Sequence, residues 1–301
     1  MKQISVIIPC YQNEGSISAL ANRLVELQEK MADRAIFSYV LVNDGSTDNT
    51  LNELLAFKQR LPDQVKIIKL ARNFGTYNAL YAGMANSEAD CHICLHADLQ
   101  DPPELISDMF SHFLQGNRLV IAYRQDREEK SFFSSLYHNM VKRYAIKNIP
   151  PGGFDLILFD EKIRTEICAM EAKNTNAMYL ITWLGYPYVA IPYIRLKREH
   201  GTSQWRLGKK AKLFVDTFFS FSNLPLVILR FFCLCSIISS FVLFTFFLWE
   251  RSASVIEQLL LLGVSAMLFI FGMIMAIVGE YMNHIHEMVR NRPNYVVNEI
   301  I

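Results

Sequence analysis

Residues 96–103 read His96-Ala97-Asp98-Leu99-Gln100-Asp101-Pro102-Pro103, and they follow an apolar, strand-like run from Cys91 to Leu95. A helical pattern begins after them, near Glu104. Carboxylates gathered at the exposed end of a strand repel one another. A divalent cation and an anionic substrate would remove that repulsion, because hard cations prefer oxygen ligands and often bridge to phosphates. The alternative is a solvated loop in which Asp101 caps the next helix and Pro102 lies in its first turn.

Strand and helix patterns alternate around this stretch. Apolar runs predict strands at 4–8, 39–42, 65–70, 91–95 and 119–122. Helical patterns are predicted at 16–31, from 47 or 48 to 55, and at 76–85, and Ile17, Leu20, Leu24 and Leu27 share one face of the first. Strands joined by helices indicate an α/β fold with a mainly parallel sheet that is covered on both faces.

Three polar clusters fall at the predicted carboxyl ends of strands, at 9–14, 44–48 and 96–101. Ligands of parallel α/β sheets bind outside the carboxyl ends of the strands, so these clusters are expected to form one site. The chain contains neither a G-x-G-x-x-G motif nor a Walker loop, which argues against ordinary dinucleotide or P-loop chemistry.

Two uncharged segments near the C-terminus predict membrane spans. Phe231–Trp249 has 19 residues and Leu259–Gly279 has 21, and a helix of either length covers about 30 Å, one hydrocarbon core. A buried helical hairpin is the alternative. Basic residues precede the first span and follow the second, so the positive-inside rule places both termini in the cytoplasm. They are Arg206, Lys209, Lys210, Lys212, Arg230, Arg290 and Arg292.

The expected organisation has four parts: a cytoplasmic catalytic domain at 1–204, amphipathic membrane-interface helices at 205–223, a two-helix transmembrane hairpin at 224–283 and a cytoplasmic tail at 284–301. The N-terminal apolar run, Ile4 to Cys10, is too short for a signal peptide. These features predict a multi-pass protein of the cell (inner) membrane.

Composition fits this organisation. The hydrophobic fraction of 51% and mean hydropathy of +0.16 are high for a soluble protein. The net charge of +1 predicts no nucleic-acid partner. Cys91 and Cys94 form a C-x-x-C motif, but residues three apart on a strand point to opposite faces. A cytoplasmic domain also disfavours disulfides, so all six cysteines are interpreted as structural.

Several motifs, in order, resemble the family 2 glycosyltransferases of the polyprenyl-phosphate type. They are Pro9-Cys10-Tyr11-Gln12-Asn13-Glu14, Asn43-Asp44-Gly45-Ser46-Thr47-Asp48, Arg72-Asn73-Phe74-Gly75, Ala97-Asp98-Leu99-Gln100-Asp101-Pro102-Pro103-Glu104 and Gly201-Thr202-Ser203-Gln204-Trp205. Gly279-Glu280-Tyr281 and Asn291-Arg292-Pro293-Asn294-Tyr295 resemble the C-terminal signature of the bacterial members. The resemblance runs nearly end to end and implies a GT-A nucleotide-sugar fold.

The resemblance also implies the donor side of the site. Asp44 matches the acidic residue that recognises the nucleotide base, with a plain turn residue as the alternative. Pro9, Tyr11 and Glu14 match the segment that lines the nucleotide pocket. Asp98 matches the residue that binds the metal, Mg²⁺ or Mn²⁺, and the diphosphate. Gln100 is the further metal-side residue, with Asp101 as a helper.

On the acceptor side, Arg124 and Arg127 match basic residues near the acceptor phosphate, unless they are solvated charges in the run 124–130. Ser203 and Trp205 lie in the segment that resembles the family's acceptor-binding motif. The implied acceptor is a polyprenyl (undecaprenyl) phosphate and the implied donor a nucleotide-sugar, with UDP-sugar expected. The sequence does not define oligomer contacts and leaves a homo-oligomer open.

Two departures from the family pattern bear on the metal and the sugar. The first Asp of the family's D-x-D motif is His96 here, and imidazole suits Mg²⁺ poorly. His96 therefore either faces the nucleotide ribose or changes the metal preference. Relatives usually read G-D-F-R-L where this chain has Gly152-Gly153-Phe154-Asp155-Leu156. Asp155 either faces the donor sugar or caps a turn.

The implied reaction is an inverting displacement. A polyprenyl phosphate is largely a dianion at neutral pH and needs no strong base, so catalysis rests on positioning and charge neutralisation. Asp98 would stabilise the departing nucleoside diphosphate through the metal, and the two arginines would hold the attacking phosphate. Transfer to the hydroxyl of a lipid-linked saccharide is a second hypothesis, in which Asp155 is the candidate base. A non-catalytic membrane scaffold is a third.

Two basic, aromatic segments are expected to meet membrane lipids. One is a helical stripe between Phe132 and Tyr144, and the other runs from Trp205 to Phe221. Such helices lie in the headgroup layer and attract anionic lipid. An ordinary core-facing stripe is the alternative for both.

Overall fold

The computed structural model of the protein describes residues 1–125, 143, 154–170, 176–196, 231–232, 238, 253–289 and 293–301. The chain divides into two units. The first is Met1–Leu213 together with Pro293–Ile301, and the second is Phe214–Arg292. The last nine residues therefore belong with the N-terminal unit, although the second unit separates the two in sequence.

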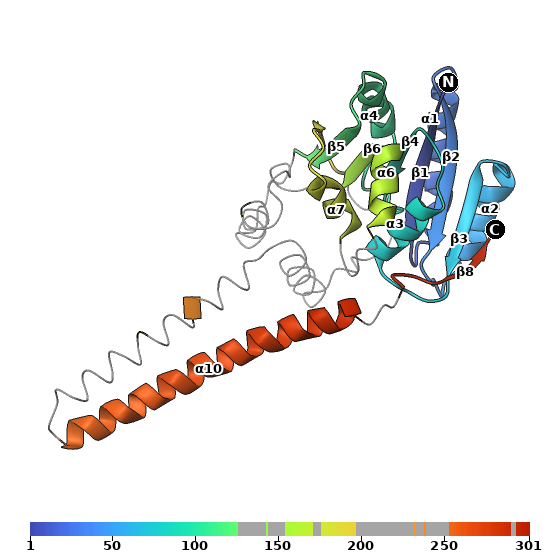
Figure 1. Cartoon of the computed structure of the whole chain (residues 1–301). Helices are drawn as coiled ribbons and strands as arrows, with labels where there is room; N and C mark the ends of the chain where they lie inside the picture. Colours follow the sequence, from blue (N-terminus) through green and yellow to red (C-terminus); the bar gives the residue numbers. More distant parts are fainter. Residues whose placement is uncertain are drawn as a thin grey trace. The chain divides into compact units, whose positions relative to one another are not determined.

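Among the described residues, eight strands of the first unit form one sheet with the order β7-β5-β6-β4-β1-β2-β3-β8 (Figure 1). The strands are β1 (Lys2–Cys10), β2 (Ala35–Asn43), β3 (Val65–Leu70), β4 (Cys91–Cys94), β5 (Leu119–Arg124), β6 (Leu156–Asp160), β7 (Val189–Tyr193) and β8 (Val297–Ile300). Pairing is parallel for β1 with β2 and β4, for β2 with β3 and for β5 with β7. It is antiparallel where β6 meets β4 and β5 and where β8 meets β3. The predicted mainly parallel sheet is confirmed.

The first four helices of the first unit follow the predicted alternation, whereas the last two, and strands β6, β7 and β8, were not predicted from the sequence. The helices are α1 (Ile17–Lys30), α2 (Thr50–Arg60), α3 (Thr76–Ala85), α4 (Leu105–Leu114), α6 (Glu161–Ala169) and α7 (Ala177–Trp183). The predicted helix at 76–85 and strand at 65–70 have the observed bounds. The helix expected from residue 47 or 48 begins only at Thr50. The residues just before it are engaged in side-chain bonds with the neighbouring loop.

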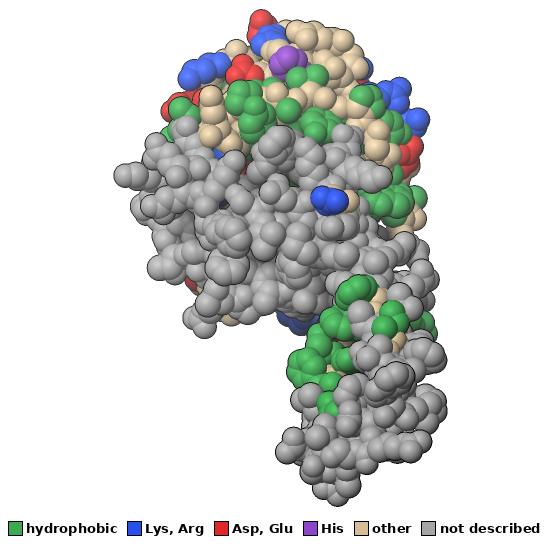
Figure 2. Space-filling view, turned by 90° about the vertical axis from the view of Figure 1, so that its left-hand side faces the viewer, with side chains coloured by type: hydrophobic (Ala, Val, Ile, Leu, Met, Phe, Trp, Pro, Cys, Tyr) green, Lys and Arg blue, Asp and Glu red, His purple; other side chains and the backbone are tan. Residues whose placement is uncertain are grey.

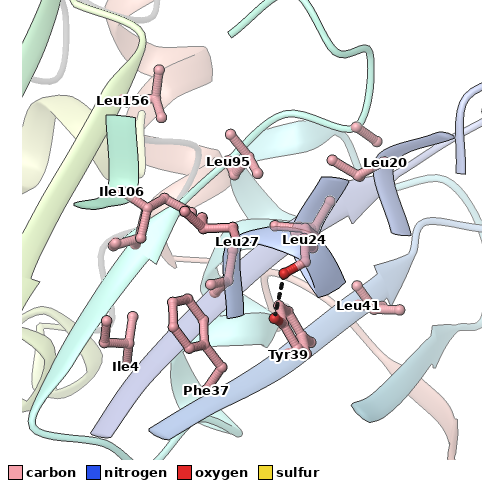
Figure 3. Packing of buried hydrophobic residues seen from close by; sticks show 14 of the residues in the cluster. Ile4, Leu20, Leu24, Leu27, Phe37, Tyr39, Leu41, Leu95, Ile106 and Leu156 are labelled. Atoms are coloured by element: carbon pink, nitrogen blue, oxygen red, sulfur yellow. Dashed lines mark hydrogen bonds between the residues drawn. The ribbon is translucent and has the colours of Figure 1, made fainter. Parts of the chain in front are cut away.

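The main core lies between one face of the sheet and helices α1, α2 and α4. The apolar face of α1 is buried as predicted, with Leu24 and Leu27 packed towards Tyr39 and Phe37 of β2 (Figure 3). The Tyr39 hydroxyl donates to the Leu24 carbonyl at 3.3 Å, which satisfies this buried polar group.

Helix α3 covers the opposite face of the sheet. It lies so close to β1 that a Cβ built on Gly83 would be 2.3 Å from Cγ2 of Ile7. Both faces of the sheet are thus covered, which explains why its inner strands read as continuous apolar runs rather than alternating ones.

The direction of each strand decides which side chains meet. Strands β1, β2, β3 and β4 end at one side of the sheet because they run parallel. Strand β6 runs the other way and begins at that side, while β5 and β7 end there. We call this side the carboxyl end of the sheet. It brings Arg124, Asp155 and Tyr193 to the loop that follows β4.

The C-terminal residues, predicted as a tail, include strand β8 at the outer side of β3 (Figure 1). Ile67 and Ile301 exchange two backbone hydrogen bonds of 2.8 and 2.9 Å. The Ala71 amide donates to the Val296 carbonyl at 3.0 Å. The end of the chain therefore lies on the same sheet as its beginning.

In the second unit, helix α10 (Ala253–Val289) contains the whole of the second predicted span. Large apolar side chains on it are exposed, including Phe269 at 70% and Met282 at 59%, and the coloured side chains of this arm are mostly hydrophobic in Figure 2. The first predicted span lies almost entirely outside the described residues. Among those residues, no helix is both long and apolar enough to cross a membrane. The two spans stay predictions.

Candidate active site

The loops that follow β1 and β2 are joined by side-chain hydrogen bonds. The Gln12 amide donates to Ser46 Oγ at 3.1 Å, and the Asn13 amide donates to Thr50 Oγ1 at 2.8 Å. In the other direction, the Asn49 amide donates to Glu14 Oε2 at 2.9 Å. Two of the three predicted polar clusters therefore form one continuous wall. Pro9 is buried at its base, Tyr11 is partly buried and Glu14 is exposed.

Asp44 anchors a third loop to this wall. Its carboxylate is 2% exposed. Oδ1 accepts from the Phe74 amide at 2.7 Å, and Oδ2 accepts from the Gly75 amide at 2.9 Å. Burial raises the pKa of Asp44, and the two amides and Arg72 oppose that rise. The bonds show a structural role for Asp44. Its predicted contact with the nucleotide base stays a prediction.

Gly45 makes this anchoring possible. Its φ is +67°, and a Cβ at this position would lie 2.4 Å from the carbonyl carbon of Arg72. A side chain here would force residues 72–75 away from Asp44, because backbone atoms cannot give way as a flexible side chain can.

The loop after β4 presents Asp98 and Gln100, the two predicted metal-side residues, at the carboxyl end of the sheet. The Gln100 amide donates to Asp98 Oδ1 at 3.2 Å, and Leu99 between them has φ +57°. The Asp98 side chain is 18% exposed. His96, on the same loop, is partly buried.

Asp101 is fully buried and does not cap α4, whose N-cap is Glu104. Its Oδ1 accepts from the Tyr193 hydroxyl at 2.6 Å and lies 3.1 Å from Arg195 Nε. Among the described residues, its Oδ2 has no hydrogen-bond partner. Burial raises the pKa of Asp101 to about 6, and the nearby Asp155 and Asp98 add to that rise. The capping alternative for Asp101 is wrong, because Tyr193 at the end of β7 and Arg195 just after it bring a hydroxyl and a guanidinium to this carboxylate.

Asp155 is paired with Arg124. Arg124 Nε donates to Oδ2 at 2.5 Å and Nη2 donates to Oδ1 at 2.7 Å, while the Tyr193 hydroxyl lies 3.4 Å from Oδ2. The side chains are 23% and 17% exposed, so the pair is largely shielded from water. Sequence analysis had placed these residues in separate roles, and the structure joins them.

The site can be tested for its fit to a divalent cation. Asp98 and Asp101 offer the carboxylate oxygens that Mg²⁺ and Mn²⁺ take, and Oδ2 of Asp101 is buried without a partner among the described residues. No group of three or more His, Cys, Asp or Glu side chains in the described part of the chain is arranged to hold a metal. Two carboxylates suffice when the ion completes its shell with substrate phosphates and water. The donor set therefore fits an ion that arrives with a diphosphate.

The other predicted site residues, Arg127, Ser203 and Trp205, lie outside the described residues, as do the two amphipathic segments apart from Arg143. Tyr193 and Arg195 were missed by sequence analysis. The signal that could have found them is the apolar run from Val189 to Ile194, which forms β7 and ends beside the 96–103 loop.

Comparisons with known proteins agree with this geometry. The sequence profile described as Glycosyl transferase family 2 matches residues 5–173. The chain belongs to this family. A glycosyltransferase of Synechocystis, described as uncharacterized, is 32% identical, and the alignment covers 99% of this chain and 95% of the relative. The undecaprenyl-phosphate 4-deoxy-4-formamido-L-arabinose transferase of Edwardsiella ictaluri is 30% identical, with 99% and 94% covered.

The structural comparison confirms the predicted GT-A fold of this family 2 enzyme. The crystal structure of mannosyl-3-phosphoglycerate synthase from Rubrobacter xylanophilus matches with a TM-score of 0.53 over 71% of each chain. Sequence identity is 14%, so the likeness concerns the fold. Family membership also confirms that the chain is a family 2 glycosyltransferase, and one of its relatives is named as an undecaprenyl-phosphate transferase.

Proposed function

We propose that this family 2 glycosyltransferase moves a sugar from a nucleotide-sugar, with UDP-sugar as the expected donor, to undecaprenyl phosphate by an inverting displacement. The observation that carries the proposal is the arrangement at the carboxyl end of the sheet. There the Asp98 and Asp101 carboxylates lie on one loop, and the Arg124–Asp155 pair reaches the same place from β5 and β6. Relatives that act on undecaprenyl phosphate align over nearly the whole chain, which supports this acceptor.

The donor would lie against the wall formed by the loops after β1 and β2. Asp44 holds residues 72–75 beside this wall, and Gly45 allows their close approach. Asp98 and Asp101 would hold a Mg²⁺ or Mn²⁺ ion, which supplies positive charge to the departing diphosphate. The Asp98 side chain is more accessible than that of Asp101, which is completely buried. Asp98 is therefore the residue that faces the ligand.

The acceptor phosphate would bind near Arg124. The contact with Asp155 orients the guanidinium, and further N–H donors remain on its Nη1. A phosphate dianion needs no base to attack. Both carboxylate oxygens of Asp155 accept from Arg124, so Asp155 is not poised as the base that a sugar hydroxyl would need. This pairing favours the phosphate acceptor over a lipid-linked saccharide.

We further propose that the chain is anchored in the cell membrane by a hairpin made of Phe231–Trp249 and Leu259–Gly279, with the catalytic unit and both termini in the cytoplasm. Exposed apolar side chains along α10 support an apolar environment for this helix. Strand β8 supports the same-side placement of the termini. It pairs with β3 of the catalytic sheet, so any membrane crossing between them must be followed by a return.

The test is an assay of the purified full-length chain with a panel of nucleotide-sugars and undecaprenyl phosphate. The expected product is a phosphate-linked sugar that mild acid releases. Asp98→Asn should lower turnover by about 10², the scale of one lost charge-stabilising group. An acid-stable product formed only from a lipid-linked saccharide would overturn the proposed acceptor. Unchanged turnover of Asp98→Asn at saturating metal would remove Asp98 from the mechanism.

A further inference from the structure

Arg195 lies between the two carboxylates of the 96–103 loop. Its Nε is 3.1 Å from Asp101 Oδ1, and its Nη2 is 3.9 Å from Asp98 Oδ2. The backbone after β7 holds it there, because the Leu196 amide donates to the Gln100 carbonyl at 2.9 Å. The Arg195 side chain is 22% exposed and Asp101 is fully buried, so water screens their attraction only in part.

Arg195 attracts the two carboxylates mainly through its charge, and not through aligned hydrogen bonds. Nε of Arg195 has no hydrogen-bond partner among the described residues, although Asp101 Oδ1 is within 3.1 Å of it. Oδ1 is already engaged by the Tyr193 hydroxyl at 2.6 Å. A guanidinium that balances charge without aligned hydrogen bonds can be displaced from its carboxylates at little cost in bond energy.

The charges at the carboxyl end of the sheet show why a counter-ion is needed. Asp98, Asp101 and Asp155 bring three carboxylates together, and Asp155 is compensated by its bidentate pair with Arg124. Asp98 and Asp101 share Arg195. Loss of Arg195 would remove a positive charge from beside both carboxylates.

We propose that Arg195 is the resident counter-ion of the Asp98–Asp101 pair and sets the affinity of that pair for a divalent cation. This inference rests on the proposed function, in which the pair holds the cation that accompanies the donor. Before the ligand arrives, Arg195 keeps the two carboxylates together in the orientation that a cation requires. When the cation binds, it replaces the guanidinium of Arg195 as the positive partner of the two carboxylates. Arg195 acts through Asp98 and Asp101, and is a positioning residue.

Arg195 therefore opposes cation binding while it preserves the geometry of the site. It keeps the cation, and the nucleoside diphosphate bound to it, from being held too tightly for release. Replacing Arg195 by a neutral residue should strengthen cation binding and slow the enzyme. A residue with a merely structural role would weaken cation binding and turnover together.

The experiment measures Mn²⁺ binding to the full-length chain by electron paramagnetic resonance, with no nucleotide or acceptor present. Arg195→Gln should bind Mn²⁺ about tenfold more tightly than the wild type, since a like charge within about 4–6 Å shifts such an equilibrium by one or more powers of ten. Arg195→Lys keeps the charge and should stay close to the wild-type affinity. Thermal unfolding checks that each variant folds, and Arg195→Met replaces Arg195→Gln if the latter does not.

Two controls locate the effect. Arg118→Gln removes the same charge from the opposite side of the sheet, where Arg118 lies 3.6 Å from Asp160, and should leave Mn²⁺ affinity unchanged. In an Asp98→Asn background, Arg195→Gln should lose most of its tightening effect because one of the two carboxylates is gone. Equal or weaker Mn²⁺ binding by Arg195→Gln would overturn the inference. Absence of Mn²⁺ binding by every variant would also overturn it, while the sugar-transfer assay would still decide the proposed function.

Discussion

Arg124 and Asp155 form a bidentate ion pair, with Nε donating to Oδ2 at 2.5 Å and Nη2 donating to Oδ1 at 2.7 Å. Arg124 is the last residue of β5, and Asp155 directly precedes β6. The antiparallel pairing of these strands brings the end of one beside the start of the other. The pair therefore unites a residue predicted to bind the acceptor with one predicted to face the donor sugar or cap a turn.

The first prediction uses this pair to separate acceptor binding from base catalysis. Arg124→Ala should raise the KM for undecaprenyl phosphate about tenfold or more, because a charge-assisted contact to a dianion is lost. Asp155→Asn should raise the same KM by less and leave kcat within about threefold, because it only loosens Arg124. The double variant should resemble Arg124→Ala alone, since both changes act on one contact. A fall in kcat of about 10² to 10⁴ for Asp155→Asn would instead identify a general base and a hydroxyl acceptor.

The second prediction concerns the close approach at Gly45. Gly45→Ala should destabilise the catalytic unit by about 3 kcal/mol, from a left-handed backbone cost of about 1–2 and an overpacking cost of about 1–3 kcal/mol. Gly116→Ala is the matched control, because its φ is +95° but a Cβ there meets nothing within 4 Å. Gly116→Ala should lower the free energy of unfolding only by the backbone cost of about 1–2 kcal/mol. Thermal unfolding ranks the two, and only Gly45→Ala should weaken nucleotide binding. Equal losses in both variants would remove the contact with Arg72 from the explanation.

The third prediction concerns pH and a buried histidine away from the site. His92 is fully buried in β4, with Nδ1 2.8 Å from Ser87 Oγ and Nε2 2.7 Å from Glu161 Oε2. Burial lowers the pKa of His92, although Glu161 opposes this effect, and Arg164 adds to it. The folded state thus prefers neutral His92, and its contribution to stability is complete above the unfolded pKa of about 6.5.

That contribution should disappear as pH falls below 6.5 through the lowered folded pKa. The stability advantage of the wild type over His92→Gln should therefore decrease from pH 7 to pH 5, and this difference cancels the opposite contribution of Asp101, whose pKa is raised to about 6. His92→Gln should be less stable at pH 7 but should show a smaller loss over the same interval. Thermal unfolding across this range measures both slopes. A wild type that gained stability on acidification relative to His92→Gln would show that the charged pair with Glu161 outweighs burial.

The fourth prediction addresses His96, which stands where relatives carry the first motif Asp. His96 is partly buried and lies two residues from Asp98 on the same loop, which favours a place beside the cation. The enzyme should therefore be more active with Mn²⁺ than with Mg²⁺, and His96→Asp should move the preference towards Mg²⁺, because Mg²⁺ prefers oxygen ligands. Activity titrated with each metal at saturating donor measures the preference. An altered donor KM with an unchanged metal preference would place His96 on the ribose, and no change in either quantity would contradict both interpretations.

The local sequence pattern predicted many of the strands and helices of the first unit. The runs that became β1 to β5 are apolar because helices cover both faces of the sheet, and that pattern is visible without any structure. The strand at 65–70 and the helix at 76–85 have their predicted bounds. The polar clusters at the ends of β1, β2 and β4 were recognisable for the same reason, since each interrupts an apolar run where the strand leaves the core.

Strands β1 to β5, helices α1 to α4, the family and the residues on the loop after β4 were therefore predictable from the sequence alone. Strands β6, β7 and β8 and the partners of the charged side chains emerged only in the folded chain. Tyr193 and Asp101 are 92 positions apart, Arg124 and Asp155 are 31 apart, and β8 returns to β3 after the second unit. The physical reason is that hydrophobic periodicity reports only whether a segment is buried. Which charges compensate each other depends on strand order and direction, and these follow from packing the whole sheet.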